Sequence, residues 1–172
     1  MIKEAKDLLE RVIKKQLPDV PVVRSAKEET HAIMARKFPL VSLITNPGTF
    51  DGTTAQIVRY FEGREYKERY VRGDRILPIL VRCWAEGEDE ASMLFSRIIP
   101  VIPSQWEYDG FAKHIEIGAE EHSDHAGNVN KMYLSVAEVR FRAAAAVDPK
   151  EAPYIEKAVP QGGEFVTRQE SV

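Results

Sequence analysis

Two imidazoles and a carboxylate lie within four residues of one another in the segment His122-Ser123-Asp124-His125. Histidine nitrogens and carboxylate oxygens are ligands that zinc and other transition metals accept. The spacing differs from recognised zinc patterns, which place paired ligands on a helix or at knuckle separations, and the segment offers no thiolate. A metal-dependent hydrolase or metal-binding module using His122, Asp124 and His125 is one hypothesis. A solvated polar loop between strands is the interpretation we favour.

Ser123, beside His122 or His125, is the candidate nucleophile of this segment. Neighbours within one loop seldom reach the geometry of a catalytic triad, and the chain has no Gly-x-Ser-x-Gly elbow. It also has no phosphate-binding glycine loop, no dinucleotide fingerprint and no helix with paired carboxylates and histidines. Trp106 and Tyr108 could line a small-molecule pocket, although aromatic residues after a proline-rich bend more often seal a core. We therefore expect no enzyme activity and no cofactor.

The composition is that of one soluble domain. The chain has 172 residues and a net charge of −3, which argues against a protein that neutralises many phosphates. The first residues lack the apolar run of a signal peptide, and no segment approaches the about 20 apolar residues that span a bilayer. We expect an intracellular protein. The lone Cys83 lies in an apolar strand and is expected to be a small buried hydrophobe.

Two helices and a strand are predicted near the N-terminus. Residues 2–17 have apolar residues at helical spacing, and Pro18 ends the pattern. Ser25 followed by Glu28 is a capping box that starts a helix over 26–37. A short strand covers 40–44 and stops at an Asn-Pro-Gly turn.

A charged hairpin is predicted over 55–75, with its turn at 62–64. It has five basic and four acidic residues, so neither face of its second strand should be deeply buried. One interpretation is a solvated hairpin with weak cross-strand ion pairs. The other is an arm that docks on a neighbouring subunit, with Tyr60, Tyr66 and Tyr70 as anchors.

Three further strands and a helix follow. After a turn at Gly73-Asp74, residues 76–84 form a strand with apolar groups on both faces, which is typical of a sheet covered on both sides. Pro78 favours an edge position or a strand start, leaving an edge open to pairing. A partner subunit is a natural candidate for the second cover. An acidic helix start at 88–90 leads a helix to about Ile98.

The C-terminal part contains a strand near 114–118 and a long strand over 131–147. One face of the long strand changes from Leu134 and Val136 to charged residues at 138, 140 and 142, so this strand should start in the core and continue over a surface. Residues 148–172 have prolines and glycines with no sustained period, and we expect a flexible tail.

The order of these features resembles the tail-terminator or tail-completion proteins of tailed bacteriophages, prophages and related contractile injection systems. The resemblance rests on the capped helix at 25–37 leading into the strand at 38–44, on the charged hairpin, on 79–84 leading into 88–99, and on the string 120–130 before the last strand. It spans residues 1–147.

The resemblance implies an α+β fold, a mainly antiparallel sheet of long strands packed against two or three helices, as a single domain over 1–147. It implies a homohexameric ring that caps the tail tube, ends its growth and docks to head-tail connector proteins. The partners would be further copies of the chain, the tail tube protein and the connector, with DNA passing through without specific binding. The protein would belong to the virion tail and, during assembly, to the host bacterial cytoplasm. A head-tail connector component is the alternative within virion assembly.

The same resemblance implies that the work of the protein is done by contact surfaces. We expect the hairpin at 61–72 and the loop at 122–130 to carry contacts with neighbouring subunits or with the tube. The candidate interface residues are Tyr60, Arg64, Tyr66, Arg69, Tyr70, His122, Asp124 and Asn128.

Overall fold

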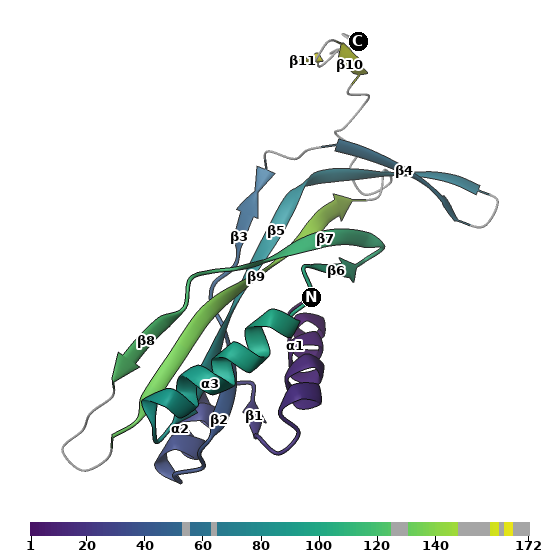
Figure 1. Ribbon diagram of the computed structural model, residues 1–172. Coiled ribbons are helices and arrows are strands. Elements are labelled where there is room, and N and C mark those ends of the chain that lie inside the picture. Colours follow the sequence, from purple (N-terminus) through teal and green to yellow (C-terminus); the bar gives the residue numbers. More distant parts are fainter. Residues whose placement is uncertain (53–55, 63–64, 125–130, 148–158, 162–163, 167–172) are drawn as a thin grey trace. The chain divides into compact units, whose positions relative to one another are not determined.

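Three helices pack on a curled, mixed and mostly antiparallel sheet of nine strands (Figure 1). The computed structural model describes residues 1–52, 56–62, 65–124, 131–147, 159–161 and 164–166. The predicted α+β fold class, with a mainly antiparallel sheet of long strands in a single domain, is confirmed. Contacts within the chain divide into two units, residues 1–50 with 75–144 and residues 51–74 with 145–172.

The sheet has the order β1-β2-β5-β9-β7-β6, with β3 and β4 also paired to β5 and β8 also paired to β9. The strands β1 and β2 pair in parallel. The pairs β2–β5, β4–β5, β6–β7, β7–β9 and β8–β9 are antiparallel. The strands are β1 (Val22–Val23), β2 (Leu40–Thr45), β3 (Thr49–Asp51), β4 (Gln56–Glu62), β5 (Glu65–Ala85), β6 (Gln105–Tyr108), β7 (Phe111–Ile117), β8 (Glu121–Asp124) and β9 (Tyr133–Val147).

The helix α1 (Ile2–Gln16) follows the predicted pattern. Ala5, Leu9 and Ile13 repeat every four residues and are completely buried. Burying a leucine or isoleucine side chain contributes about 1.5–3 kcal/mol, so this one stripe accounts for the position of the helix on the sheet.

The helix α2 (Ala26–Met34) begins at the predicted cap and ends earlier than predicted. The Ser25 hydroxyl accepts from the Glu28 N–H at 3.2 Å. The predicted end at residue 37 is wrong. Arg36 adopts a φ of +51°, and the Lys37 N–H bonds back to the Ala32 carbonyl at 3.0 Å, which closes the last turn.

The strand β5 is one continuous strand of 21 residues, so the predicted turn at Gly73-Asp74 is wrong. Gly73 has a φ of +154°, which glycine adopts more easily than other residues, and the strand continues through it. The predicted edge position of Pro78 is also wrong. Pro78 lies inside β5, opposite the point where β2 ends, and its carbonyl accepts from the Asn46 N–H at 3.0 Å. The missing N–H therefore costs little.

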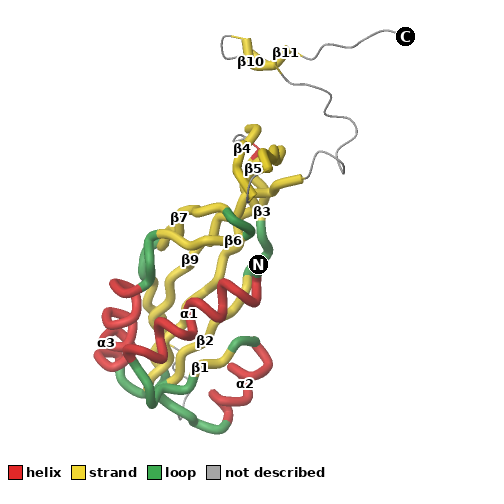
Figure 2. Tube along the Cα trace, turned by 90° about the vertical axis from the view of Figure 1, so that its right-hand side faces the viewer, coloured by secondary structure: helices red, strands yellow, loops and turns green. Residues whose placement is uncertain are grey.

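Helices cover both faces of the sheet, with α3 (Glu88–Ile98) on one side and α2 on the other (Figure 2). The helices α1 and α3 pack on the first face, and the alternate residues of β5 and β9 that they cover are Leu77, Ile79, Val81, Cys83, Ala137, Val139 and Phe141. On the second face, Ala32 of α2 packs with Leu40, Trp84 and Leu134. At this end of the sheet the chain supplies its own second cover, where the sequence had pointed to a partner.

A buried carboxylate attaches α2 to the second face. Glu29 is only 5% exposed. Its carboxylate accepts hydrogen bonds from the Ser42 hydroxyl at 2.5 Å and the Trp84 indole at 2.8 Å, and it pairs with Arg82 at 3.0 Å. Since three donors satisfy it, the charge can remain buried.

The second unit contains the charged hairpin, whose strands β4 and β5 are antiparallel from Gln56↔Val71 to Glu62↔Glu65. The predicted hairpin is confirmed, and most of its turn, at 63–64, lies outside the described residues. In the predicted tail, the described strands β10 (Val159–Gln161) and β11 (Glu164–Val166) pair with each other.

We predict that Glu29→Ala lowers the free energy of unfolding by about 3 kcal/mol, because two buried donors lose their acceptor and Arg82 loses its partner. For a domain of this size that is a fall in melting temperature of roughly 6–12 °C. Thermal unfolding followed by circular dichroism measures it. Lys27→Ala, an exposed change on the same helix, is the control. Equal melting temperatures for the two variants would contradict the role of Glu29.

Candidate functional site

The histidine segment begins as a strand. His122 and Asp124 lie in β8, opposite Ser135 and Tyr133 of β9, so the prediction of a loop is wrong for residues 121–124. His125 and Asn128 lie outside the described residues, and so does the side chain of Asp124. The sequence did not predict β8 because its residues are polar and lack the apolar alternation of a strand. What makes them a strand is their pairing with β9, which is distant in the sequence.

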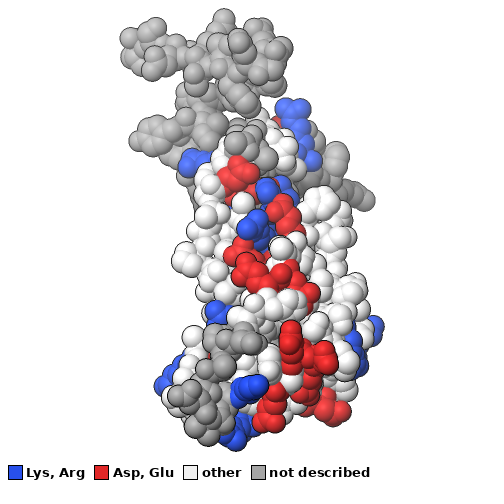
Figure 3. All heavy atoms as spheres, turned by 60° about the vertical axis from the view of Figure 1, so that its left-hand side comes forward, with Lys and Arg blue, Asp and Glu red and all other residues white. Residues whose placement is uncertain are grey.

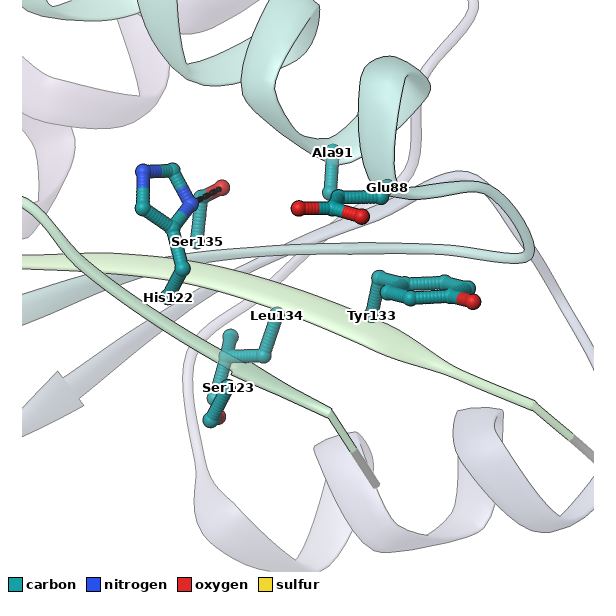
Figure 4. Close-up of a pocket in the computed structure, with 7 residues that line it drawn as sticks. All are labelled: Glu88, Ala91, His122, Ser123, Tyr133, Leu134 and Ser135. Carbon is teal, nitrogen blue, oxygen red and sulfur yellow. Dashed lines mark hydrogen bonds between the residues drawn. The ribbon is translucent and has the colours of Figure 1, made fainter. Parts of the chain in front are cut away.

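A cavity of about 330 Å³ lies where β8, β9 and the start of α3 meet (Figure 4). It is lined by Glu88, Ala91, His122, Ser123, Tyr133, Leu134 and Ser135. Within it, His122 and Ser123 point to opposite sides of β8, as successive residues of a strand do. Ser123 is therefore not placed to be activated by His122.

His122 instead contacts a different serine. Its Nδ1 lies 3.0 Å from the Ser135 hydroxyl, and its Nε2 lies 3.3 Å from Glu120 Oε1. A serine, a histidine and a carboxylate thus contact one another in the same succession as in a catalytic triad. Ser135, however, is only 1% exposed. A nucleophile must reach its substrate. The contact between His122 and Ser135 joins β8 to β9. Sequence reasoning missed Ser135 because it lies 13 positions from His122.

The metal hypothesis gains no support from the described residues. No group of three or more His, Cys, Asp or Glu side chains among them is arranged to hold a metal ion. Both nitrogens of His122 already have partners.

The other two candidates for chemistry belong to the core. Cys83 is completely buried, and burial raises the pKa of its thiol to about 12, with a smaller contribution from Glu120. Trp106 is 7% exposed, stacks on Tyr108 with ring centroids 5.3 Å apart, and donates from its indole to the Arg142 carbonyl at 2.6 Å. The core interpretation is confirmed for both Cys83 and Trp106.

The described part of the hairpin places two interface candidates on opposite faces. Tyr70 lies opposite Ile57, and Arg69 lies opposite Val58. Both Tyr70 and Arg69 are partly buried. Tyr60 of β4 and Tyr66 of β5 keep their predicted strand positions, although their side chains are not among those described, and Arg64 lies outside the described residues.

A charged groove on the second face of the sheet was not predicted as a site. This sheet groove has a volume of about 580 Å³ and is lined by Asn46, Pro47, Thr49, Ile76, Pro78, Glu116, Glu138, Arg140 and Arg142. The sequence did show the change to charged residues along β9. It could not show the contributions of Asn46 and Glu116, which come from segments far away in the chain.

The charges of the sheet groove alternate in sign. Glu116 pairs with Arg142 at 2.8 Å, and Glu138 pairs with Arg140 at 2.6 Å. Asn46 Nδ2 also donates to Glu138 at 3.4 Å. On the face in Figure 3, acidic and basic side chains lie next to one another down the centre, and further acidic side chains gather below them. The groove can therefore receive a surface that carries both signs of charge.

No protein-family model matches the chain, and no curated protein matches its sequence. Within the described residues, none of the helices has the length and apolar composition needed to cross a membrane.

We predict that protein purified without chelator holds no stoichiometric metal and that His122→Ala leaves its metal content unchanged, because the imidazole nitrogens are engaged by Ser135 and Glu120. Elemental analysis measures this. His114→Ala, which changes another exposed histidine, is the control. A stoichiometric metal that is lost only in His122→Ala would establish the metal site instead.

We predict that Cys83 is nearly unreactive in the folded protein. With a pKa of about 12, the thiolate at pH 8 is only about one part in ten thousand, against roughly a quarter for an unfolded cysteine. Alkylation by iodoacetamide should be at least about 100-fold slower in buffer than in urea. Arg11→Cys provides an exposed thiol as the control. Similar rates in both solvents would show that the strand opens readily.

Proposed function

We propose that this chain is a structural protein of a bacteriophage or prophage tail, which assembles with copies of itself into a ring on the tail tube. The ring ends growth of the tube and docks to the head-tail connector. The proposal combines the resemblance of residues 1–147 to tail-terminator proteins with the observed α+β fold. Its expected places are the virion tail and, during assembly, the host cytoplasm.

The observation that carries the proposal is a hairpin with little core of its own. Val71 is the only apolar side chain of residues 51–74 that is buried, among those the structure describes. Ile57, Val58 and Tyr70 stay partly exposed. Because a two-stranded hairpin alone is marginally stable in water, its faces gain most when another molecule covers them.

The hairpin also favours a ring over a simple dimer. If one surface of a copy binds a different surface of the next, the contact is heterologous, and a heterologous contact repeated around a closing rotation makes a ring. The net charge of −3 is compatible with DNA that passes through the ring without strong attraction. The proposed partners are other copies of the chain, the tail tube protein and the connector.

Native mass spectrometry with negative-stain microscopy tests the proposed function. We expect a closed annulus of six copies, either free or after addition of tail tube protein, and tubes that stop growing when the chain is present. Tubes of unchanged length, with no annulus bound to their ends, would refute the proposal.

We predict that shortening the hairpin leaves a folded monomer and abolishes the ring. Ile57 and Tyr70 face each other across the two strands, so an Asn-Gly turn can replace residues 58–69. Circular dichroism should be nearly unchanged, because the main core lies in the other unit. Native mass spectrometry measures how many copies assemble.

The control for this experiment is Arg72→Lys, an exposed change that keeps the hairpin and its charge. Normal assembly by the shortened, folded protein would show that the hairpin has no role in the ring.

A further inference from the structure

We infer that the hairpin of one copy docks into the sheet groove of the next copy, where Arg59 and Glu68 exchange ion pairs with Glu116 and Arg140. This inference rests on the proposed function and deepens it, because it names the two surfaces that meet. The donor surface is the described part of β4 and β5 over 56–71, and the acceptor is the groove of about 580 Å³.

None of the described helices contributes a residue to the lining of the sheet groove. The helix α2 packs on the second face around Leu40, Trp84 and Leu134. None of these three residues lines the groove. Ile76 and Pro78 supply apolar surface there, and a volume of this size accommodates several side chains. Among the described residues, a helix thus provides the second cover over one part of this face, and none lies over the groove.

The charged residues of the groove keep capacity for further bonds. Arg140 is 50% exposed and pairs with Glu138 through Nε. Its two terminal nitrogens bind none of the described residues, and a guanidinium has five N–H donors. Glu116 is 44% exposed and uses one oxygen for Arg142. A partner with one acid and one base can therefore bind without breaking the existing pairs.

The hairpin presents such a pair on one face. In the strand register, Ile57 lies opposite Tyr70, and Arg59 lies opposite Glu68 on the same side of the hairpin. The Arg59 to Glu68 ion pair is 2.9 Å long, and these side chains are 63% and 35% exposed. With Arg59 at Glu116 and Glu68 at Arg140, Tyr70 can cover the partly exposed Ile76.

A second copy is the occupant because each chain carries both surfaces. The acceptor residues belong to the unit 1–50 with 75–144, and the donor residues belong to the unit 51–74 with 145–172. The two surfaces differ, so the contact is heterologous and can close into a ring. Opposite charges across such a contact would also set its register and suppress wrong pairings.

Charge reversal tests the pairing. Arg140→Glu alone and Glu68→Arg alone should each weaken self-association by at least about tenfold. An equimolar mixture of the two variants should associate again. In that mixture the basic side chain introduced by Glu68→Arg meets the acidic side chain introduced by Arg140→Glu, and each remaining contact keeps the original Glu68 and Arg140. Alternation of this kind closes only in a ring with an even number of copies.

The matched control is Arg11→Glu, an equal charge change on the exposed side of α1. Thermal unfolding shows whether charge reversal unfolds the protein. If it does, Arg140→Gln replaces Arg140→Glu in the experiment, and a smaller loss of self-association is expected. Rings that form normally in folded Arg140→Glu or Arg140→Gln would overturn this inference and leave the proposed function standing. A mixture that stays dissociated would overturn the pairing of Glu68 with Arg140.

Crosslinking supplies an independent readout. In a Tyr70→Cys, Ile76→Cys variant the two thiols are six residues apart on one strand, about 20 Å, so a disulfide between them must join two copies. Mild oxidation should give a ladder of covalent multimers, and the buried Cys83 should not compete.

An Arg11→Cys, Ile76→Cys variant should give no such ladder, and Tyr70→Cys alone can give dimers at most. Absence of the ladder from the first variant, or a crosslink of Tyr70→Cys to tail tube protein in its place, would overturn the docking of hairpin into groove. The experiment with tail tube protein, which measures tube length and the annulus at the tube ends, tests the proposed function separately.

Discussion

The structure depends on one constraint, which is that the end of β5, from Cys83 to Ala85, is buried on both faces. Its odd-numbered residues pack under α1 and α3, and Trp84 packs under α2 on the opposite side. A strand with two apolar faces is stable only where both are covered. The Glu29 carboxylate, bound to Arg82 and Trp84 of this strand, places α2 where the second cover is needed.

The same strand explains why the proposed function depends on contacts. In one direction β5 enters the covered core, and in the other it forms half of a hairpin that buries little apolar surface among its described residues. His122 is bound to Ser135, and Cys83 lies inside the core. The proposed contact between copies uses exposed pairs of opposite charge.

The sequence predicted those features that depend on neighbouring residues. The stripe of α1, the Ser25 cap, the hairpin and the alternation along β9 follow from periods of about 3.6 and 2. Errors arose where a local signal competed with pairing. Gly73-Asp74 and Pro78 are signals for a turn or an edge, but pairing with neighbouring strands keeps them inside β5. The polar residues 121–124 form a strand because β9 offers them a partner.

By itself, the sequence determined where most helices and strands lie and which face of each is apolar, because caps and hydrophobic periods act over a few residues. Only the tertiary structure decided which distant groups meet. Glu29 reaches Trp84 across 55 positions, and Asn46 reaches Glu138 across 92. Such contacts follow from the order of strands in the sheet, which no local pattern encodes. The buried network under α2 and the sheet groove are therefore properties of the fold.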